Sequence, residues 1–210
     1  MRPYGYIALE GLIGAGKTTL AHRLAEKWGG RLVLEEFDDN PFLPRFYAEP
    51  ERYAFSVELS FLAQRYHQLK RTTEQDLFSN CTVADYSIGK SLVFASVTLA
   101  KDEYALFMDL YGIMYADLPA PDLLVYLHMD MDLVRERIRS RGRAYEQNIE
   151  ASYLERLQEG YLDHLRKLTR SRVLVVDIAE HDLRKDGKAF DRLLELVSSE
   201  HPMGYAVHTL

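Results

Sequence analysis

The sequence is short of cysteine and of positive charge. Cys81 is the only cysteine among 210 residues, so no disulfide can form within the chain and a zinc site built on paired cysteines is excluded. Lysine and arginine together number 26, against 32 aspartate and glutamate residues, which gives a formal net charge of −6. Proteins that bind nucleic acids broadly are usually basic, so we expect no nucleic-acid partner.

Long apolar segments are scarce as well. No run of apolar residues approaches the length of roughly 18 that a membrane-spanning helix needs. The beginning of the sequence, MRPYGYIALEG, lacks the long apolar region of a signal peptide. Together with the single cysteine, this favours a cytoplasmic protein without a membrane partner. Hydrophobic residues make up 47% of the chain and charged residues 28%, as in ordinary globular proteins, so residues 1–210 are expected to form one domain.

Five short apolar segments have the length of β-strands. They are YGYIALE (4–10), RLVLEE (31–36), CTVADY (81–86), DLLVYLHM (122–129) and RVLVVDI (172–178). Several are apolar throughout, as in strands that are buried on both faces of a parallel sheet. Helical segments lie between them, at residues 18–28, 50–75, 90–100, 102–118, 131–142 and 151–169. This alternation predicts an α/β fold in which a five-stranded parallel sheet is flanked by helices.

The glycine-rich stretch GLIGAGKTT lies between the first predicted strand and the first predicted helix. Four residues separate Gly11 from Gly16, which Lys17 and Thr18 follow, and this is the spacing of a phosphate-binding P-loop. In such a loop the backbone N–H groups surround phosphate oxygens, the lysine reaches the β- and γ-phosphates, and the hydroxyl can bind Mg²⁺. The stretch predicts a site for ATP or GTP formed by Gly11, Gly14, Ala15, Gly16, Lys17, Thr18 and Thr19.

Two carboxylates, Glu35 and Glu36, end the second predicted strand, at the edge where parallel sheets bind ligands. A hydroxyl group that accepts a phosphoryl group keeps its proton until late, so a carboxylate within hydrogen-bond reach is useful there. Because strand alternation points only one of the two side chains into the cleft, we predict Glu36 as the base and keep Glu35 as the alternative. A solvated acidic turn would explain the stretch about equally well.

The stretch RERIRSRGRAYEQ places five arginines within nine positions of an otherwise acidic chain. On a helix Arg137 and Arg141 are neighbours on one face, whereas Arg135 and Arg139 form a separate row that is expected to be solvated. Gly142 would end the helix directly after them. The cluster is therefore expected to bind an anion through part of its arginines, and the P-loop identifies that anion as a nucleotide.

Together, these motifs resemble the deoxynucleoside kinase family, in its bacterial purine-type branch, over nearly the whole chain. The resemblance is carried by the P-loop, by the acidic strand end followed by DDNPFLPRFY, and by the pattern Phe55, Glu58 and Arg65 on the long helix. It implies a P-loop kinase fold and an ATP- and Mg²⁺-dependent enzyme that phosphorylates the 5′-hydroxyl of a deoxynucleoside, with purines favoured. It also implies a homodimer.

On the acceptor side, the resemblance implies that Glu58 bonds the base and that Arg65 lies beside it. Tyr47 would contact the sugar 3′-hydroxyl and pair there with Glu146. The spacing of Glu58 and Arg65 also fits an ordinary ion pair on one helix face, which is the simpler explanation when the family is left aside.

On the donor side, the resemblance implies an arginine-rich lid over residues of about 135–150. Arg137, Arg141 and Arg143 would engage the donor phosphates, and Arg141 would act in catalysis with Lys17 by neutralising charge in the transition state. The loop DIAEHDL (177–183), with Asp182 and Leu183, would hold the adenine of ATP.

The third predicted strand departs from the family pattern. The family usually has an acidic residue, an arginine and a serine there, whereas this chain has Asp85, Tyr86 and Ser87. Asp85 fits the metal-side role, with Thr18 as the second ligand. Tyr86 cannot supply the charge of the missing arginine, and Lys90 is the residue that either replaces this charge or contacts the substrate.

Two other functions remain possible at this point. A nucleoside monophosphate kinase of the thymidylate kinase type would share the P-loop, fold and lid, although the carboxylates of the second strand count against an anionic acceptor. A non-enzymatic nucleotide switch is the other alternative. A GTP-dependent switch would be expected to carry an Asn-Lys-x-Asp motif, which this sequence lacks.

Overall fold

A six-stranded parallel sheet forms the centre of the protein in the computed structural model. The structure describes residues 4–36, 40–74, 81–116, 118–147, 149–178, 181–183 and 185–210. The strands are β1 (Tyr6–Gly11), β2 (Arg31–Val33), β3 (Thr82–Ala84), β4 (Leu123–His128), β5 (Arg172–Asp177) and β6 (Gly204–Thr209). Their order across the sheet is β2-β3-β1-β4-β5-β6. All neighbouring strands are parallel, with Ile7 of β1 opposite Val83 of β3 and Leu123 of β4.

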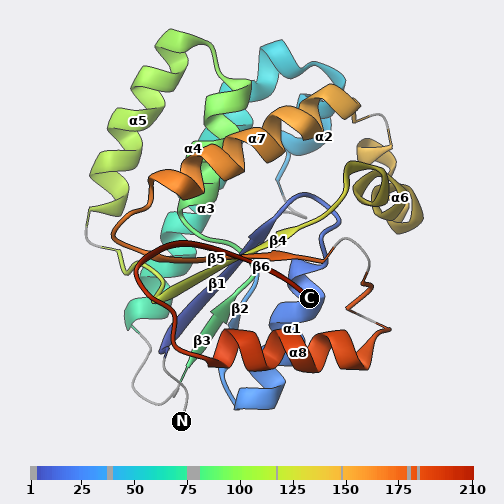
Figure 1. Cartoon of the computed structure of the whole chain (residues 1–210). Coiled ribbons are helices and arrows are strands. Elements are labelled where there is room, and N and C mark those ends of the chain that lie inside the picture. Colours follow the sequence, from blue (N-terminus) through green and yellow to red (C-terminus); the bar gives the residue numbers. More distant parts are fainter. Residues whose placement is uncertain are drawn as a thin grey trace.

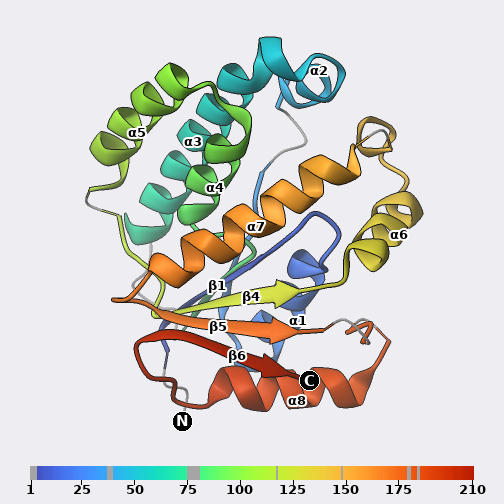
Figure 2. The same cartoon turned by 45° about the horizontal axis from the view of Figure 1, so that its top comes forward.

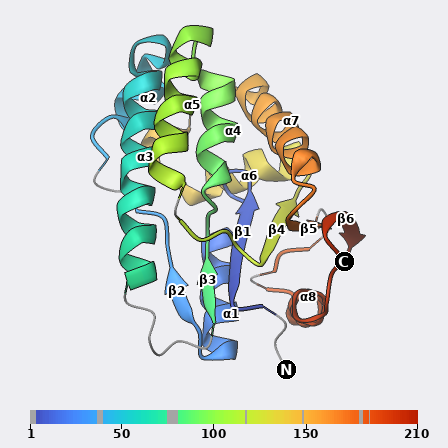
Figure 3. The same cartoon turned by 90° about the vertical axis from the view of Figure 1, so that its left-hand side faces the viewer.

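Helices connect the strands. They are α1 (Lys17–Trp28), α2 (Leu43–Ala48), α3 (Pro50–Glu74), α4 (Gly89–Thr98), α5 (Lys101–Tyr115), α6 (Met131–Arg141), α7 (Ala151–Lys167) and α8 (Gly187–Ser198), with a 3₁₀ turn η1 (Ala144–Glu146) after α6. Helices α1 and α8 cover one face of the sheet, and α3, α4, α5 and α7 cover the other (Figures 1 and 3). No helix within these described ranges combines the length and the apolar character needed to cross a membrane.

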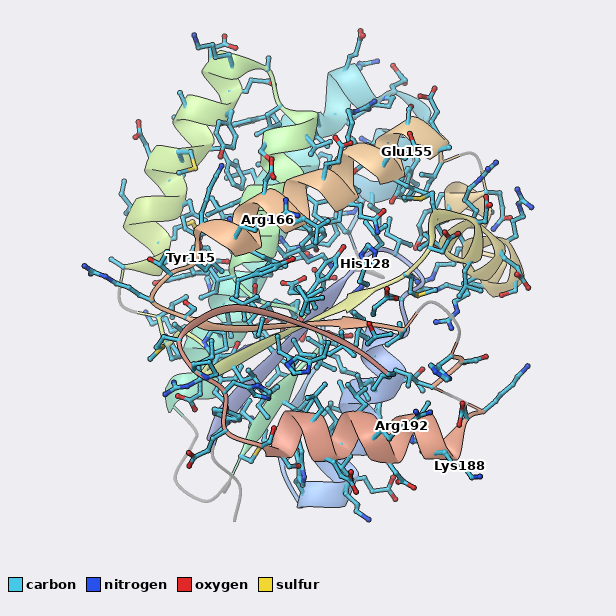
Figure 4. The ribbon with its side chains drawn as sticks, in the orientation of Figure 1. Tyr115, His128, Glu155, Arg166, Lys188 and Arg192 are labelled. Carbon is cyan, nitrogen blue, oxygen red and sulfur yellow. The ribbon has the colours of Figure 1, made fainter. Side chains whose placement is uncertain are left out.

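The outer helices turn their charged side chains to solvent. Figure 4 shows Glu155 and Arg166 on α7 and Lys188 and Arg192 on α8, and all four are exposed. The sides of these helices that face the sheet are apolar, with Leu157 of α7 among the residues of the main core. The central strands β1, β4 and β5 are almost entirely buried, as expected for strands covered on both faces.

The predicted α/β architecture is confirmed, with six strands where five were expected. The additional strand β6 lies at the edge of the sheet and has only partly buried or exposed residues, and its sequence GYAVHT carries no long apolar run. Helices α2 and α8 were also not predicted. Strand β2 ends at Val33, earlier than the predicted 36, so Glu35 and Glu36 lie in the loop that follows it.

The carboxyl ends of the strands lie on the side of the molecule that carries α6 (Figure 2). The P-loop leaves β1 at this edge, and the segment after β2 and the segment after β3 end there as well. The chain therefore brings the phosphate loop and the two acidic stretches to one place, the edge at which parallel α/β sheets bind ligands.

Candidate active site

The P-loop has the conformation that its glycines predict. Gly11 has a φ of 146°, and a Cβ atom at this position would lie 2.9 Å from the carbonyl oxygen of Leu127. Gly16 is left-handed, with a φ of 86°, and occupies the N-cap of α1. A side chain at either position would strain the backbone, and at Gly11 it would also collide with β4. The loop therefore presents the N-terminus of α1 toward the cavity, which suits a phosphate group.

Lys17 lies inside this loop. Its Nζ atom donates to the carbonyl oxygens of Gly11 and Leu12, at 2.9 Å each. Burial, followed by the nearby charge of Lys90, lowers the pKa of Lys17 to about 8, whereas Glu10, Glu35 and Asp85 act in the opposite direction. An incoming phosphate would give this buried ammonium group a stronger acceptor than the backbone carbonyls.

Asp85 joins the P-loop to the segment after β2. Its Oδ2 atom accepts a hydrogen bond of 2.5 Å from the hydroxyl of Thr18, and its Oδ1 atom accepts one of 2.7 Å from the backbone N–H of Glu35. A hydroxyl and one carboxylate fit Mg²⁺, which binds to proteins through few protein ligands and completes its shell with phosphate oxygens and water. Among the described residues, no group of three His, Cys, Asp or Glu side chains gathers as a metal site.

Glu35 is held between two cations. Arg65 donates to its Oε1 atom through Nε at 2.9 Å and Nη2 at 2.6 Å, and the ammonium group of Lys90 bonds its Oε2 atom. Burial alone would raise the pKa of Glu35, but the charges of Lys90 and Arg65 outweigh it and lower this pKa to about 2. The carboxylate is therefore ionised, fixed in orientation and directed into the cavity.

Glu36, which we predicted as the base, is turned away from the cavity. Its side chain is 65% exposed and lies 3.7 Å from the guanidinium of Arg71 at the surface of α3. The residues that line the cavity include Glu35 but not Glu36. The alternation argument placed the two residues on a strand, yet β2 ends at Val33, so the pleat no longer decides which side chain points inward. Of the two carboxylates, Glu35, the alternative, is the one that lines the cavity.

One cavity, of about 110 Å³, runs from the P-loop to α3. It brings together most of the predicted site residues: Gly14, Lys17, Thr18, Glu35, Tyr47, Glu58, Arg65, Asp85, Lys90, Arg141 and Arg143. Sequence reasoning missed the aromatic part of its wall, which includes Phe61 of α3, Phe94 of α4 and Tyr153 of α7. These residues carry no motif, and their spacing fits core packing equally well, so nothing in the sequence alone marked them.

Glu58 and Arg65 are both buried, but they do not form the ion pair that their spacing allowed. Arg65 bonds Glu35, as described, and donates to the hydroxyl of Ser91 at 2.6 Å. Glu58 instead lies beside Thr98, whose hydroxyl is 3.3 Å from its Oε1 atom. Burial raises the pKa of Glu58 to about 7, because the loss of solvation outweighs the charge of Arg65.

The lid residues Arg141 and Arg143 meet at Glu146. Their guanidinium groups lie 3.8 Å and 3.3 Å from its Oε1 atom, whereas its buried Oε2 atom has no hydrogen-bond partner. The ring of Tyr47 stacks on that of Tyr145, with the ring centres 5.8 Å apart. Burial, followed by the charge of Glu146, raises the pKa of Tyr47. Tyr47 and Glu146 thus lie near each other, as the resemblance implied.

Arg137 does not share the cavity with the other two lid arginines. It is buried, donates to the carbonyl oxygen of His181 at 3.2 Å, and lies 4.0 Å from the carboxylate of Asp182. A second, smaller cavity beside the P-loop is lined by Ala15, Gly16, Thr19, Leu20, Arg23, Arg137, Asp182 and Leu183. The predicted donor-side residues Thr19, Asp182 and Leu183 gather here, together with Arg23, which sequence reasoning missed. Arg135 and Arg139 are exposed, as predicted.

The residue that replaces the expected arginine after β3 plays no part in the cavity. Tyr86 is completely buried, and its hydroxyl donates to Gln68 at 2.6 Å. Lys90, one turn further along the chain, lines the cavity and bonds Glu35. Parts of three predicted segments fall outside the described residues: 38–39 of the acidic stretch, 148 of the lid and 179–180 of the adenine loop.

The fold and the site define a P-loop protein in which a cavity for an acceptor adjoins the phosphate-binding loop. Comparison with known proteins makes the class more specific. The sequence profile described as "Deoxynucleoside kinase" matches residues 7–201. The chain belongs to the deoxynucleoside kinase family, and it is an enzyme that phosphorylates a deoxynucleoside.

Similar curated proteins agree with this assignment. A deoxyguanosine kinase of Bacillus subtilis is 37% identical over 193 residues, which cover 90% of this chain and 93% of that protein. A deoxyadenosine/deoxycytidine kinase of the same organism is 31% identical over 201 residues, which cover 92% and 91%. Among solved structures, deoxyadenosine kinase from M. mycoides with bound dATP shares the fold, with a TM-score of 0.78 and 22% identity over 92% of this chain and 99% of that chain.

Proposed function

We propose that this protein transfers the γ-phosphoryl group of ATP to the 5′-hydroxyl of a purine deoxynucleoside, with Glu35 as the group that accepts the hydroxyl proton. One observation carries this proposal: the carboxylate of Glu35, fixed by Arg65 and Lys90, lines the same cavity as Lys17 and Thr18 of the P-loop. An acceptor hydroxyl beside Glu35 would face a phosphoryl group held by the loop.

The low pKa of Glu35 suits a late proton transfer. A carboxylate with a pKa of about 2 is a weak base toward an alcohol in its ground state. In a loose phosphoryl-transfer transition state the hydroxyl becomes acidic only as the new P–O bond forms, so the carboxylate mainly orients it until then. Fixed ionisation keeps Glu35 an acceptor of hydrogen bonds throughout the neutral pH range.

The donor side would be held by the residues around the P-loop. Lys17 and the N–H groups of the loop would bind the β- and γ-phosphates, and Arg141 would neutralise charge on the transferred group. Thr18 and Asp85 would hold Mg²⁺, which supplies further positive charge to the phosphates. The second cavity, beside Asp182 and Leu183, would take the adenosine part of ATP.

The acceptor side argues against a monophosphate as substrate. A nucleoside monophosphate would place a phosphate group with about two negative charges beside the ionised Glu35, and the two anions would repel each other. A neutral nucleoside hydroxyl brings none. Purine preference is supported by the two Bacillus relatives, which are named for deoxyguanosine and for deoxyadenosine together with deoxycytidine.

Two further features belong to this proposal. Leu106 and Ile113, seven residues apart on α5, are 51% and 78% exposed, which supports a homodimer that covers this face. Sedimentation equilibrium would reveal a dimer. The presence of a single, buried cysteine supports a cytoplasmic location.

A phosphotransfer assay with ATP, the four deoxynucleosides and their monophosphates tests the function. We expect turnover of a purine deoxynucleoside, and activity on monophosphates alone would overturn the proposal. The matched variants Glu35→Gln and Glu36→Gln test the base. The first is expected to lose 10²-fold or more in kcat, roughly the contribution of acid–base catalysis, while the second keeps near-normal turnover. The opposite result would return the role to Glu36.

A further inference from the structure

Glu58 is a buried carboxyl group in the acceptor part of the cavity, and the proposed mechanism gives it no proton to move. It is 3% exposed and lines the cavity with the aromatic rings of Phe61 and Phe94. Within the described part of the chain no cation forms an ion pair with Glu58, since the guanidinium of Arg65 is directed to Glu35. A carboxyl group in this position is available to a ligand.

The neighbourhood of Glu58 accommodates either of its ionisation states. The hydroxyl of Thr98 lies 3.3 Å from Glu58 Oε1 and 2.9 Å from the carbonyl oxygen of Phe94. A hydroxyl has one proton to donate and two lone pairs that accept. It can donate to Oε1 of Glu58 in either state, because a neutral carboxyl group that carries its proton on Oε2 still accepts at Oε1, and that proton then remains available to a ligand. Neither state leaves the hydroxyl unsatisfied.

The electrostatic surroundings keep both states within reach near neutral pH. Burial raises the pKa of Glu58 to about 7, while the charge of Arg65, the hydrogen bond of Thr98 and the charge of Lys90 act against this rise, and Glu35 adds to it. The other titratable or charged side chains that line the cavity are Lys17, Tyr47, Asp85, Arg141, Arg143 and Tyr153.

The two purine bases require opposite hydrogen-bonding patterns from such a group. Guanine presents two adjacent donors, its N1–H and its exocyclic amino group. Adenine presents an acceptor, N1, beside a donor, its exocyclic amino group. An ionised carboxylate only accepts hydrogen bonds and therefore matches guanine, whereas a neutral carboxylic acid donates one bond and accepts another and therefore matches adenine.

We propose that the ionisation state of Glu58 sets the purine preference of the enzyme, with the carboxylate selecting deoxyguanosine and the neutral acid selecting deoxyadenosine. This inference rests on the proposed function, and it adds a specificity-determining role for one residue of the same site. It makes the ratio of the two activities a function of pH, with deoxyguanosine gaining as pH rises.

The ratio of kcat/KM for deoxyguanosine to kcat/KM for deoxyadenosine, measured from about pH 6 to about pH 8, tests the inference. The kcat/KM for each nucleoside is proportional to the fraction of free enzyme in which Glu58 has the matching ionisation state. If each nucleoside binds only its matching state, the ratio is expected to rise about tenfold per pH unit. All other ionisations of the enzyme affect both substrates alike and cancel. A ratio that does not change with pH would overturn the inference.

Glu58→Gln is the decisive variant because an amide does not titrate. Its activity ratio should be independent of pH, whereas Glu51→Gln, an exposed carboxylate seven residues earlier on α3, should retain the wild-type dependence. A Glu58→Gln enzyme with the wild-type pH dependence would also overturn the inference. Wild-type enzyme that phosphorylates no deoxynucleoside would instead overturn the proposed function, and the inference with it.

Calorimetry on the wild-type protein gives a second test that needs no variant. Near pH 7, binding of deoxyguanosine should release protons and binding of deoxyadenosine should take them up, because each nucleoside selects one ionisation state. The dependence of the binding enthalpy on the ionisation enthalpy of the buffer reports this proton transfer. Opposite signs for the two nucleosides would support the inference, and equal signs or no transfer would refute it.

Discussion

Replacement of Lys90 by methionine tests whether the two cations beside Glu35 keep it ionised. Methionine retains much of the aliphatic volume and removes the charge that bonds Glu35 Oε2, while Arg65 still bonds Oε1. The side chains of Lys90 and Glu35 are 10% and 13% exposed, so little solvent compensates for the loss. We expect the pKa of Glu35 to rise by roughly one to three units, the usual effect of one adjacent charge.

The lowered pKa of Glu35 can also be expressed as a contribution to the free energy of unfolding. The pKa of Glu35 lies at about 2 in the folded protein, against an ordinary value of 4.5. A lowered pKa contributes stability that is present above about pH 4.5 and is lost as pH falls through about 2, and 2.5 units correspond to about 3 kcal/mol. Lys90→Met should lower the free energy of unfolding at neutral pH by an amount of this order.

Two assays check this reasoning. In wild-type enzyme, protonation of Glu35 should not lower kcat/KM above about pH 4. In Lys90→Met, kcat/KM should begin to fall at a higher pH, because the pKa of Glu35 is raised. Urea unfolding at about pH 7 and about pH 3 should show a smaller difference for the variant than for wild type. Lys90→Arg keeps the charge and serves as the control. An unchanged acidic limb in Lys90→Met, with normal turnover, would refute the role assigned to the lysine.

Two more predictions concern the P-loop and its metal side. Gly11→Ala should destabilise the protein by about 1–3 kcal/mol and reduce ATP affinity, because the new methyl group would lie 2.9 Å from the Leu127 carbonyl oxygen in a backbone conformation with a φ of 146°; thermal unfolding and nucleotide titration would measure both effects. Asp85→Asn should raise the Mg²⁺ concentration needed for half-maximal turnover roughly tenfold or more, because it removes the carboxylate charge beside the hydroxyl of Thr18. It also changes the group that accepts from the backbone N–H of Glu35. A metal titration with wild-type apparent affinity would argue against Asp85 as a ligand.

The elements that could be predicted from sequence are those whose signal is local. The buried strands read as apolar runs, and the P-loop has a fixed spacing that leaves little freedom in its conformation. The edge strand β6 has no such signal, because a strand paired on one side and half-exposed needs no apolar run. Its place is decided by its pairing with β5, which depends on the rest of the fold.

The carboxylate that lines the cavity lies one residue before the predicted one, for a physical reason. Alternation decides the direction of a side chain only where the chain is a strand, and β2 stops at Val33. Beyond that point the direction of Glu35 depends on Arg65 and Lys90, which are 30 and 55 residues away in the sequence. Tertiary contacts of this kind leave no trace in local spacing.

The same contacts explain how the site accommodates Tyr86 where the resemblance led us to expect an arginine. A buried carboxylate such as that of Glu35 would strongly destabilise the protein without a cation beside it. This requirement is electrostatic, so the cation can come from any sequence position that the fold brings close. Here α3 and α4 pack beside each other, so Arg65 and Lys90 reach Glu35 from two helices. Tyr86 packs in the core instead, where its hydroxyl donates a hydrogen bond to Gln68 of α3. In this chain a positive charge beside Glu35 comes from Lys90 in the first turn of α4. Because the side chain at position 86 contacts Gln68 and not Glu35, we expect that Tyr86→Arg would not restore phosphotransfer activity to Lys90→Met.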